Sequence, residues 1–213
     1  MAESTTAPAV VRDYDPADRE ALYRVCLLTG EHGGDATHVY EDDPDALARI
    51  YVGPYLDFHP EFARVLEDQD GVCGYALATP ESRAFYDRYA RCIVPNLRRR
   101  FPLPEGDAER WTAAQSVHYR YHNPISFCPE PYDEYPAHLH IDLIARVHRR
   151  GYGTVMMSQL FDRLTTAGVP GVHLGMGAWN ERAYAFYRSI GFHELTRVGS
   201  ETDGTVYMGK RLR

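Results

Sequence analysis

A short turn that carries two glycines, Gly151 and Gly153, constrains this 213-residue chain more than any other segment. It follows an apolar run over 138–147 and opens a helical pattern that runs to about Gly168. Glycine adopts positive φ and lets the backbone come close to a ligand. The free N–H groups and the positive dipole end of the following helix favour a phosphate or pyrophosphate. The sequence therefore predicts a strand, a basic glycine turn and a helix start that together cradle an anion.

Composition narrows the class of protein. The chain has 44% hydrophobic and 25% charged residues, which is typical of a soluble globular protein. Its net charge of −7 argues against a nucleic-acid partner and favours a cationic or amine-bearing substrate, with a neutral substrate as the alternative. No CxxC pair, signal peptide or membrane-length apolar run is visible, so we expect a cytoplasmic protein with reduced thiols and no membrane partner. The scattered cysteines are Cys26, Cys73, Cys92 and Cys128.

Hydrophobic periodicity predicts an α/β fold with helices on the faces of a sheet. We expect strands over 9–14, 62–67, 72–78, 138–144, 171–176, 192–198 and 205–210. We expect helices from Asp15-Pro16 onward, with Asp15 as the N-cap, and over 44–55, 82–100, 107–121, 154–167 and 180–190. Gly168 is expected at the position after the C-cap of the helix over 154–167. Residues 1–8 are small and polar and carry no predicted element. The segment 80–136 is rich in aromatics, arginine and proline, and is interpreted as a helical insertion.

The strand and the glycine turn resemble the first motif of the GNAT superfamily of acyl-CoA-dependent N-acetyltransferases. That motif is Leu-x-Val, a short linker, then Gln/Arg-x-x-Gly-x-Gly/Ala, and here Ile141 and Leu143 stand at the Leu and Val positions. His148 stands where Gln or Arg is usual, which is a departure. A solvated basic turn is the alternative interpretation. The rest of the motif is filled by Arg149, Arg150, Gly151, Tyr152 and Gly153.

A second segment, 180–192, resembles the other signature of this superfamily, Asn-x-x-Ala-x-x-Leu/Phe-Tyr-x-x-x-Gly-Phe. Helical spacing puts Asn180, Ala183 and Tyr187 near one face. The resemblance implies that the Asn contacts the pantetheine arm and that the Tyr hydroxyl protonates the leaving thiolate. A short amphipathic helix with Tyr187 half-buried is the alternative.

Together the two motifs imply one GNAT domain over 1–213, with a mixed, mostly antiparallel sheet flanked by helices. Its parts are 9–79, the insertion 80–136, and an acetyl-CoA-binding core with C-terminal strands over 137–213. The cosubstrate implied is acetyl-CoA, with no metal, and the acceptor a small-molecule or peptide amine. The residues implied to bind acetyl-CoA are Ile141, Asp142, Leu143, Arg149, Arg150, Gly151, Tyr152, Gly153, Thr154, Asn180, Ala183, Phe186 and Tyr187.

Three polar residues on the strand before the turn are candidates for proton transfer. Alternation puts His138, His140 and Asp142 on one face, where a side chain could accept a proton from an ammonium. The His-Leu-His run resembles arylalkylamine N-acetyltransferases, but with a one-residue offset that favours packing or hydrogen-bonding roles. Asp142 and His140 remain candidate bases beside Tyr187 as general acid.

The next predicted strand lacks a carboxylate. Many superfamily members have Leu-Glu-Val here, with the Glu acting as base through water, whereas this chain has Leu174-Gly175-Met176. Asp142, a histidine or the insertion would then supply the base, or the protein is a weak or inactive catalyst.

Two further patterns carry weaker predictions. His118 and His122, four residues apart, could share a metal, but no third ligand is evident, so a pocket wall or helix packing is favoured. The run Arg98-Arg99-Arg100 is interpreted as a solvated helix end, with an auxiliary phosphate contact as the alternative.

The segment 135–142 after an aromatic insertion is similar to bacterial acetyltransferases related to the C-terminal acetyltransferase-like domain of human O-GlcNAcase. That domain is regarded as a pseudo-acetyltransferase because its cofactor residues are eroded, whereas this chain retains Asn180, Tyr187 and the glycines. Two functions follow: acetyl transfer to a primary amine, or an acetyl-CoA-binding or protein-interaction module without transfer.

Overall fold

A seven-stranded sheet runs through the computed structural model, which describes residues 8–200 and 202–213. Its strand order is β1-β2-β3-β4-β5-β7-β6. The strands are β1 (Val10–Asp13), β2 (Ala63–Asp68), β3 (Gly71–Thr79), β4 (Ala137–Leu143), β5 (Gly171–Gly177), β6 (His193–Val198) and β7 (Thr205–Arg211). The pair β4–β5 is parallel, whereas β1–β2, β2–β3, β5–β7 and β6–β7 are antiparallel. The predicted mixed, mostly antiparallel sheet is confirmed, while the predictions for 1–7 lie outside the described residues.

The chain divides into two compact units. One comprises the described part of Met1–Leu77 with Thr112–Ala114 and Ile141–Leu160, and the other comprises Ala78–Trp111, Gln115–His140 and the described part of Phe161–Arg213. The strands β3 and β4 therefore begin in one unit and end in the other. Whether 1–213 acts as a single domain stays a prediction.

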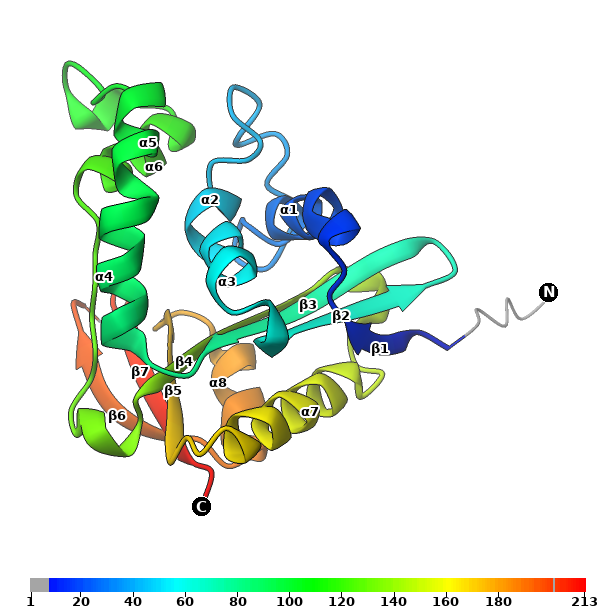
Figure 1. Cartoon of the computed structure of the whole chain (residues 1–213). Coiled ribbons are helices and arrows are strands. Elements are labelled where there is room, and N and C mark those ends of the chain that lie inside the picture. The colour runs from blue at the N-terminus through cyan, green and yellow to red at the C-terminus, as the bar shows by residue number, and fades with distance from the viewer. Residues whose placement is uncertain (1–7, 201) are drawn as a thin grey trace. The chain divides into compact units, whose positions relative to one another are not determined.

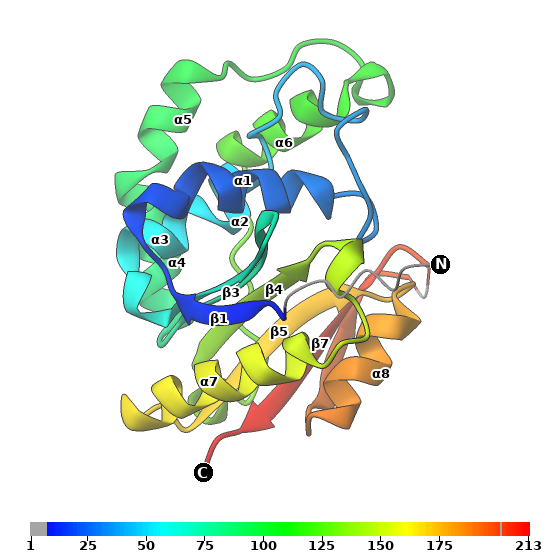
Figure 2. The ribbon, with the colours of Figure 1, turned by 90° about the vertical axis from the view of Figure 1, so that its right-hand side faces the viewer.

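Helices cover both faces of the sheet in the first unit. Helices α1 (Arg19–Leu28), α2 (Ala48–Tyr51) and α3 (Gly53–Phe58) lie on one face of β1–β3, and the first part of α7 (Tyr152–Thr166) lies on the other (Figures 1 and 2). The apolar face of α1 is buried through Leu22, Val25 and Cys26, as its periodicity predicts.

The helix expected over 44–55 is divided, and the cause is proline. It consists of α2 and α3, with the break at Val52 and with Pro54 in the first turn of α3. Proline has no N–H to donate and clashes with the preceding turn, so it is accepted only where a helix starts. The same rule places a new helix at Pro95, which divides the helix expected over 82–100.

The second unit contains the predicted insertion. Its helices are α4 (Ser82–Cys92), α5 (Val94–Arg100), α6 (Ala113–His122, of which Gln115–His122 belongs to this unit) and, later in the chain, α8 (Glu181–Ser189). A separate 3-10 turn over Ala108–Arg110 precedes α6, so the helix expected over 107–121 begins six residues later than predicted. Arg98, Arg99 and Arg100 occupy the last turn of α5, which confirms the predicted helix end.

The termini of α7 are set by local chemistry. Gly168 has φ +86°, and the N–H of Val169 donates to the Leu164 carbonyl at 3.0 Å while that of Gly168 donates to Thr165 at 3.0 Å. These two bonds form a Schellman motif, with Gly168 at the position after the C-cap as the sequence predicts.

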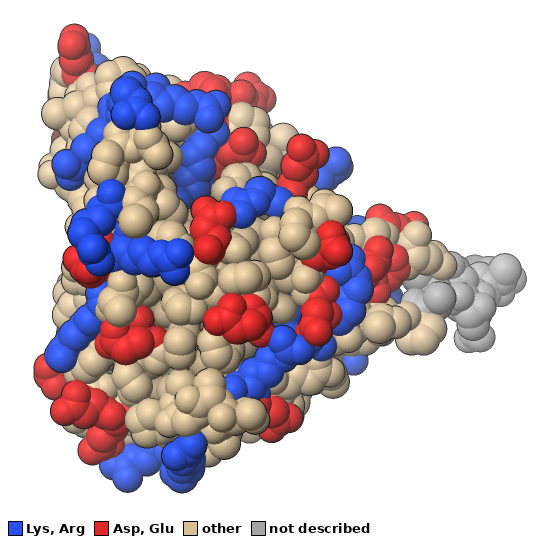
Figure 3. All heavy atoms as spheres, viewed as in Figure 1, with Lys and Arg blue, Asp and Glu red and all other residues tan. Residues whose placement is uncertain are grey.

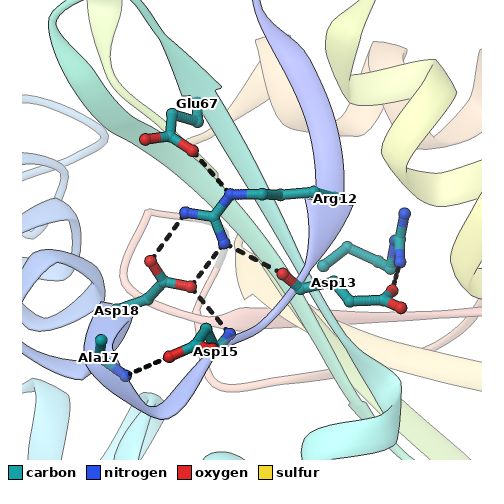
Figure 4. A network of polar contacts seen from close by, with 7 residues as sticks. Arg12, Asp13, Asp15, Ala17, Asp18 and Glu67 are labelled. Atoms are coloured by element: carbon teal, nitrogen blue, oxygen red, sulfur yellow. Dashed lines mark hydrogen bonds and ion pairs between the residues drawn. The ribbon is translucent and has the colours of Figure 1, made fainter.

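An ion-pair network joins the first strand to the first helix. The Arg12 guanidinium donates to both carboxylate oxygens of Asp18, at 2.6 and 2.8 Å, and to Glu67 at 2.6 Å (Figure 4). Asp15 caps the helical turn through Ala17 N–H at 2.8 Å, and the Asp18 side chain accepts from Asp15 N–H in return. The Arg12 guanidinium beside Asp18 holds the pKa of that carboxyl below its usual range.

We expect Asp18→Asn to lower the free energy of unfolding by about 1 kcal/mol at pH 7, since Asp18 is buried while Arg12 stays partly exposed and screened. The contribution of a carboxyl with a lowered pKa is present above its unfolded pKa and is lost as the pH falls through its folded pKa. The unfolding free energies of the two proteins in urea should therefore differ at pH 7 and approach each other progressively as the pH falls below about 4. The exposed Glu105→Gln is the control; a difference independent of pH would contradict the assignment.

Candidate acetyl-CoA site

The glycine turn takes the conformation that an anion cradle requires. Gly151 has φ +81° and Arg149 has φ +59°, and a Cβ on Gly151 would meet nothing within 4 Å, so Gly151 is needed for its backbone angle rather than for space. Helix α7 starts at Tyr152, two residues before the predicted start. The N–H groups of Tyr152, Gly153 and Thr154 therefore lie in the first turn, where no intrahelical carbonyl can accept from them.

The side chains of the turn divide into two groups. Arg149 and Arg150 are exposed, and their guanidinium groups are accessible to an anion. The Tyr152 hydroxyl instead accepts from the N–H of Ala9 at 2.9 Å, which anchors the segment before β1. Tyr152 can therefore serve a ligand through its backbone N–H, while its side chain has a structural role.

His148 ties the turn to the end of β4. Its Nε2 lies 2.6 Å from the carbonyl oxygen of Leu143. A carbonyl only accepts, so Nε2 carries the proton and donates. His148 therefore supplies a side-chain donor, as the family's Gln or Arg would, and this donor holds the strand end against the turn.

Glycine at position 74 brings β4 close to β3. A Cβ on Gly74 would collide with the Leu143 side chain and lie 3.0 Å from the Asp142 carbonyl oxygen. Beyond this point the N–H of Ile144 donates to Cys73 at 3.0 Å. The strand end carrying Ile141, Asp142 and Leu143 is therefore fixed by backbone contact with β3.

The Asp142 carboxylate has a buried partner. The Tyr75 hydroxyl donates to Asp142 Oδ2 at 2.6 Å, and the Cys26 thiol interacts with the same hydroxyl. Removal from water raises the pKa of Asp142, and the Tyr75 hydrogen bond opposes that rise. Burial also raises the pKa of Cys26 to about 12, so the thiol stays protonated near neutral pH.

The two strand histidines have different environments. Burial lowers the pKa of His140 to about 4, so the ring is neutral at pH 7 and is a weak proton acceptor. His138 is buried; its Nδ1 lies 2.7 Å from Ser82 Oγ, and its ring stacks on Tyr86 at 5.0 Å. Because the Ser82 hydroxyl donates to the Pro136 carbonyl, Nδ1 of His138 carries the proton.

The α8 residues lie in the second unit and form a local structure of their own. Asn180 is the N-cap of α8, and its side-chain oxygen accepts from the Ala183 N–H at 2.9 Å. Tyr187 is buried, with its ring centroid 5.3 Å from that of Phe186 and 5.6 Å from that of Phe192. Asn180 therefore has a capping role besides any role toward a ligand.

Aromatic packing occupies the position where the family has its strand carboxylate. A Cβ on Gly175 would lie 3.0 Å from the Tyr207 ring, which in turn packs on Phe127 with ring centroids 4.2 Å apart. The glycine is accounted for by this packing, and β5 offers no carboxylate at the position.

The two helical histidines of the insertion serve packing. His118 lies against Phe101 with ring centroids 4.7 Å apart, and His122 Nε2 bonds the Phe101 carbonyl at 2.8 Å. Over residues 8–200 and 202–213, no group of three or more His, Cys, Asp or Glu side chains could hold a metal ion.

Sequence reasoning missed Gly74, Tyr75 and Cys26. A tyrosine inside the otherwise apolar run 72–78 was the available signal, because a buried Tyr hydroxyl usually finds a hydrogen-bond partner. Nothing local in the sequence identifies that partner as Asp142.

A strand end, an anion-cradling turn at a helix start and an Asn-capped signature helix are features of an acyl-CoA-dependent acyltransferase. A model of the Acetyltransferase (GNAT) family matches residues 107–192. The crystal structure of SsHAT superimposes with a TM-score of 0.86 at 33% identity, covering 97% of this chain and 100% of that one. The chain belongs to the GNAT acetyltransferase family, whose members transfer acetyl groups from acetyl-CoA.

Other relatives extend the comparison. Protein O-GlcNAcase from Mus musculus and that from Rattus norvegicus are each 25% identical over 98% of this chain. The match spans 22% of the length of those proteins. A GNAT superfamily phosphinothricin acetyltransferase from Sinorhizobium meliloti, in complex with AcCoA, shares the fold at 16% identity, covering 95% of this chain and 88% of that one, with a TM-score of 0.57. Among the described residues, no helix is both long and apolar enough to cross a membrane.

We expect His148→Ala to weaken acetyl-CoA binding about tenfold, because the loss of one hydrogen bond releases the turn from the strand end. His148→Gln restores a donor and should bind within about threefold of the wild type. Calorimetric titration with acetyl-CoA measures both.

His122→Ala is the matched control, since it removes another histidine bonded to a main-chain carbonyl. If His148→Ala and the wild type bind acetyl-CoA equally, the turn does not depend on this bond.

Proposed function

We propose that this protein transfers an acetyl group from acetyl-CoA to a primary amine, with Asp142 as the general base. The observation that carries this proposal is a half-buried carboxylate, with a raised pKa, on the strand that leads into the glycine turn. A carboxylate removed from water is a better proton acceptor near neutral pH than an exposed one.

Acetyl-CoA is a substrate here, and the turn has the chemistry to hold its pyrophosphate. The first-turn N–H groups of α7 and the guanidinium groups of Arg149 and Arg150 are suited to phosphate oxygens. The remaining proposed binding residues are Ile141, Asp142, Leu143, Gly151, Tyr152, Gly153, Thr154, Asn180, Ala183, Phe186 and Tyr187. The match to the family motifs supports their assignment.

The proposed reaction is a direct attack. The amine nitrogen bonds to the thioester carbonyl carbon, and the Leu143 N–H stabilises the negative charge that develops on the carbonyl oxygen. Asp142 takes the proton that the nitrogen loses. The carbon–sulfur bond then breaks, and Tyr187 gives its hydroxyl proton to the leaving thiolate. His140, with a pKa of about 4, is the weaker candidate base.

The acceptor is proposed to be a small-molecule or peptide amine. Figure 3 shows acidic and basic side chains interspersed on the face drawn. On this face charges of both signs lie close together, so the face itself gives no preference for a strongly charged acceptor.

The proposed function is tested by titrating acetyl-CoA calorimetrically and measuring thiol release across a panel of amines, amino sugars and peptides. Wild-type protein should bind acetyl-CoA and release CoA with at least one amine. Asp142→Asn should keep binding within about threefold and lose about 100-fold in turnover near neutral pH. Binding without release for any amine would instead support an acetyl-CoA-binding module, and no binding would exclude both.

We expect Tyr187→Phe to lower turnover about 100-fold with little change in acetyl-CoA affinity, because the ring and its packing remain while the proton donor is lost. Steady-state thiol release and calorimetry measure the two quantities. Tyr184→Phe, on the same helix, is the control. Equal losses of turnover and affinity in Tyr187→Phe would contradict the general-acid role.

A further inference from the structure

Tyr75, on β3, contacts the proposed base Asp142, which lies on β4. Its side chain is fully buried on β3, and its hydroxyl donates to Asp142 Oδ2 at 2.6 Å. This is a short hydrogen bond of the kind that forms when the acceptor is charged. Among the described residues, Tyr75 makes the hydrogen bond to the Asp142 carboxylate, and it engages Oδ2 rather than Oδ1.

The direction of the protons in this cluster follows from the donor count. A tyrosine hydroxyl has one proton, and that proton goes to Asp142. Cys26, on α1, interacts electrostatically with both Tyr75 and Asp142. Tyr75 and Asp142 are therefore joined by one hydrogen bond, which the tyrosine hydroxyl donates.

We propose that Tyr75 is a positioning residue that holds Oδ2 of Asp142, so that Oδ1 is left to accept the proton from the amine. This inference rests on the proposed function of Asp142. Tyr75 touches no reacting atom itself; it acts through the orientation and charge of the carboxylate.

Neither Tyr75 nor Cys26 loses its proton near neutral pH. Burial raises the pKa of Tyr75 well above its ordinary value and that of Cys26 to about 12, so both keep their protons. His140, on the same face of β4, has a pKa of about 4 and stays neutral. Among the described residues, Tyr75 from β3 is the titratable group that shifts the pKa of Asp142, while the charge of Asp142 raises the pKa of Cys26 on α1.

The direction in which the loss of the Tyr75 hydroxyl shifts the pKa of Asp142 depends on which form of Asp142 the hydroxyl stabilises. The Tyr75 hydrogen bond stabilises the carboxylate, so its loss raises the pKa of Asp142 further. A base must be deprotonated to act, so kcat/KM falls as the pH drops through that pKa. Removing the hydroxyl should therefore move the acidic limb of the pH profile upward by about one to two pH units, the equivalent of one hydrogen bond to a charged group.

The test compares Tyr75→Phe with the wild-type chain of 213 residues in the acetyl-CoA and amine assay. The variant should bind acetyl-CoA within about twofold, lose about tenfold in kcat/KM at neutral pH, and recover much of that loss at higher pH. Tyr89→Phe, which removes a buried hydroxyl from α4, is the matched control and should leave the pH profile in place. A merely structural role for Tyr75 would lower stability without moving the limb.

Two further measurements make the outcome decisive. In an Asp142→Asn background, Tyr75→Phe should have no further effect on turnover, because its role passes through the carboxylate. The Asp142 carboxyl pKa, measured by carbon-13 NMR, should rise in Tyr75→Phe. If Tyr75→Phe does not fold, the chain labelled with 3-fluorotyrosine, whose hydroxyl is a stronger donor, should show a lower Asp142 carboxyl pKa, and an unchanged pKa would overturn the proposal.

Failure of this inference and failure of the proposed function give different results. An active wild type whose acidic limb and carboxyl pKa are unchanged in Tyr75→Phe overturns the role of Tyr75 alone. A wild type that releases no CoA with any amine overturns the proposed function, and with it the positioning role, whatever the carboxyl pKa.

Discussion

The candidate site depends on the close approach of β4 to β3 at Gly74. The Leu143 side chain and the Asp142 carbonyl fill the space that any larger side chain would need. The next residue on β3 is Tyr75, so the same approach brings the Asp142 carboxylate within 2.6 Å of a buried hydroxyl. The hydrogen bond from the Ile144 N–H to the Cys73 carbonyl then holds the chain against β3 just before the turn. One residue without a side chain thus positions both the proposed base and the strand end before the glycines.

Burial acts on two neighbouring candidates with opposite chemical results. His140 and Asp142 lie two positions apart on β4, and desolvation is the largest influence on the pKa of each. Loss of water always disfavours the charged form. It therefore weakens the histidine as a proton acceptor and strengthens the carboxylate. This is why the environment favours Asp142 over His140 as the base, although alternation along the strand places both side chains on the same face.

What could be predicted from the sequence is what local chemistry determines. The caps at Asp15 and Gly168 and the helix signature after Asn180 use partners within a few residues, and each was predicted. The helix divisions at Pro54 and Pro95 follow from the same local rules. The prediction missed them because hydrophobic periodicity continues across both prolines, whereas proline starts a new helix. The partnership of Tyr75 with Asp142 joins residues 67 positions apart. Such a contact is set by strand order and register, which short patterns do not contain.

Position 175 explains why the base has to be sought on β4. The resemblance to the superfamily would place a glutamate between Leu174 and Met176, but the Tyr207 ring lies against Gly175 and packs on Phe127. A side chain there would have its Cβ 3.0 Å from the Tyr207 ring, so the ring would have to shift by a few tenths of an ångström. The exchange of a carboxylate for aromatic contacts on β5 removes one proton acceptor from the fold. The carboxylate that β4 itself carries is Asp142, and the Tyr75 hydrogen bond keeps it in a defined orientation, which is the requirement that a replacement base must meet.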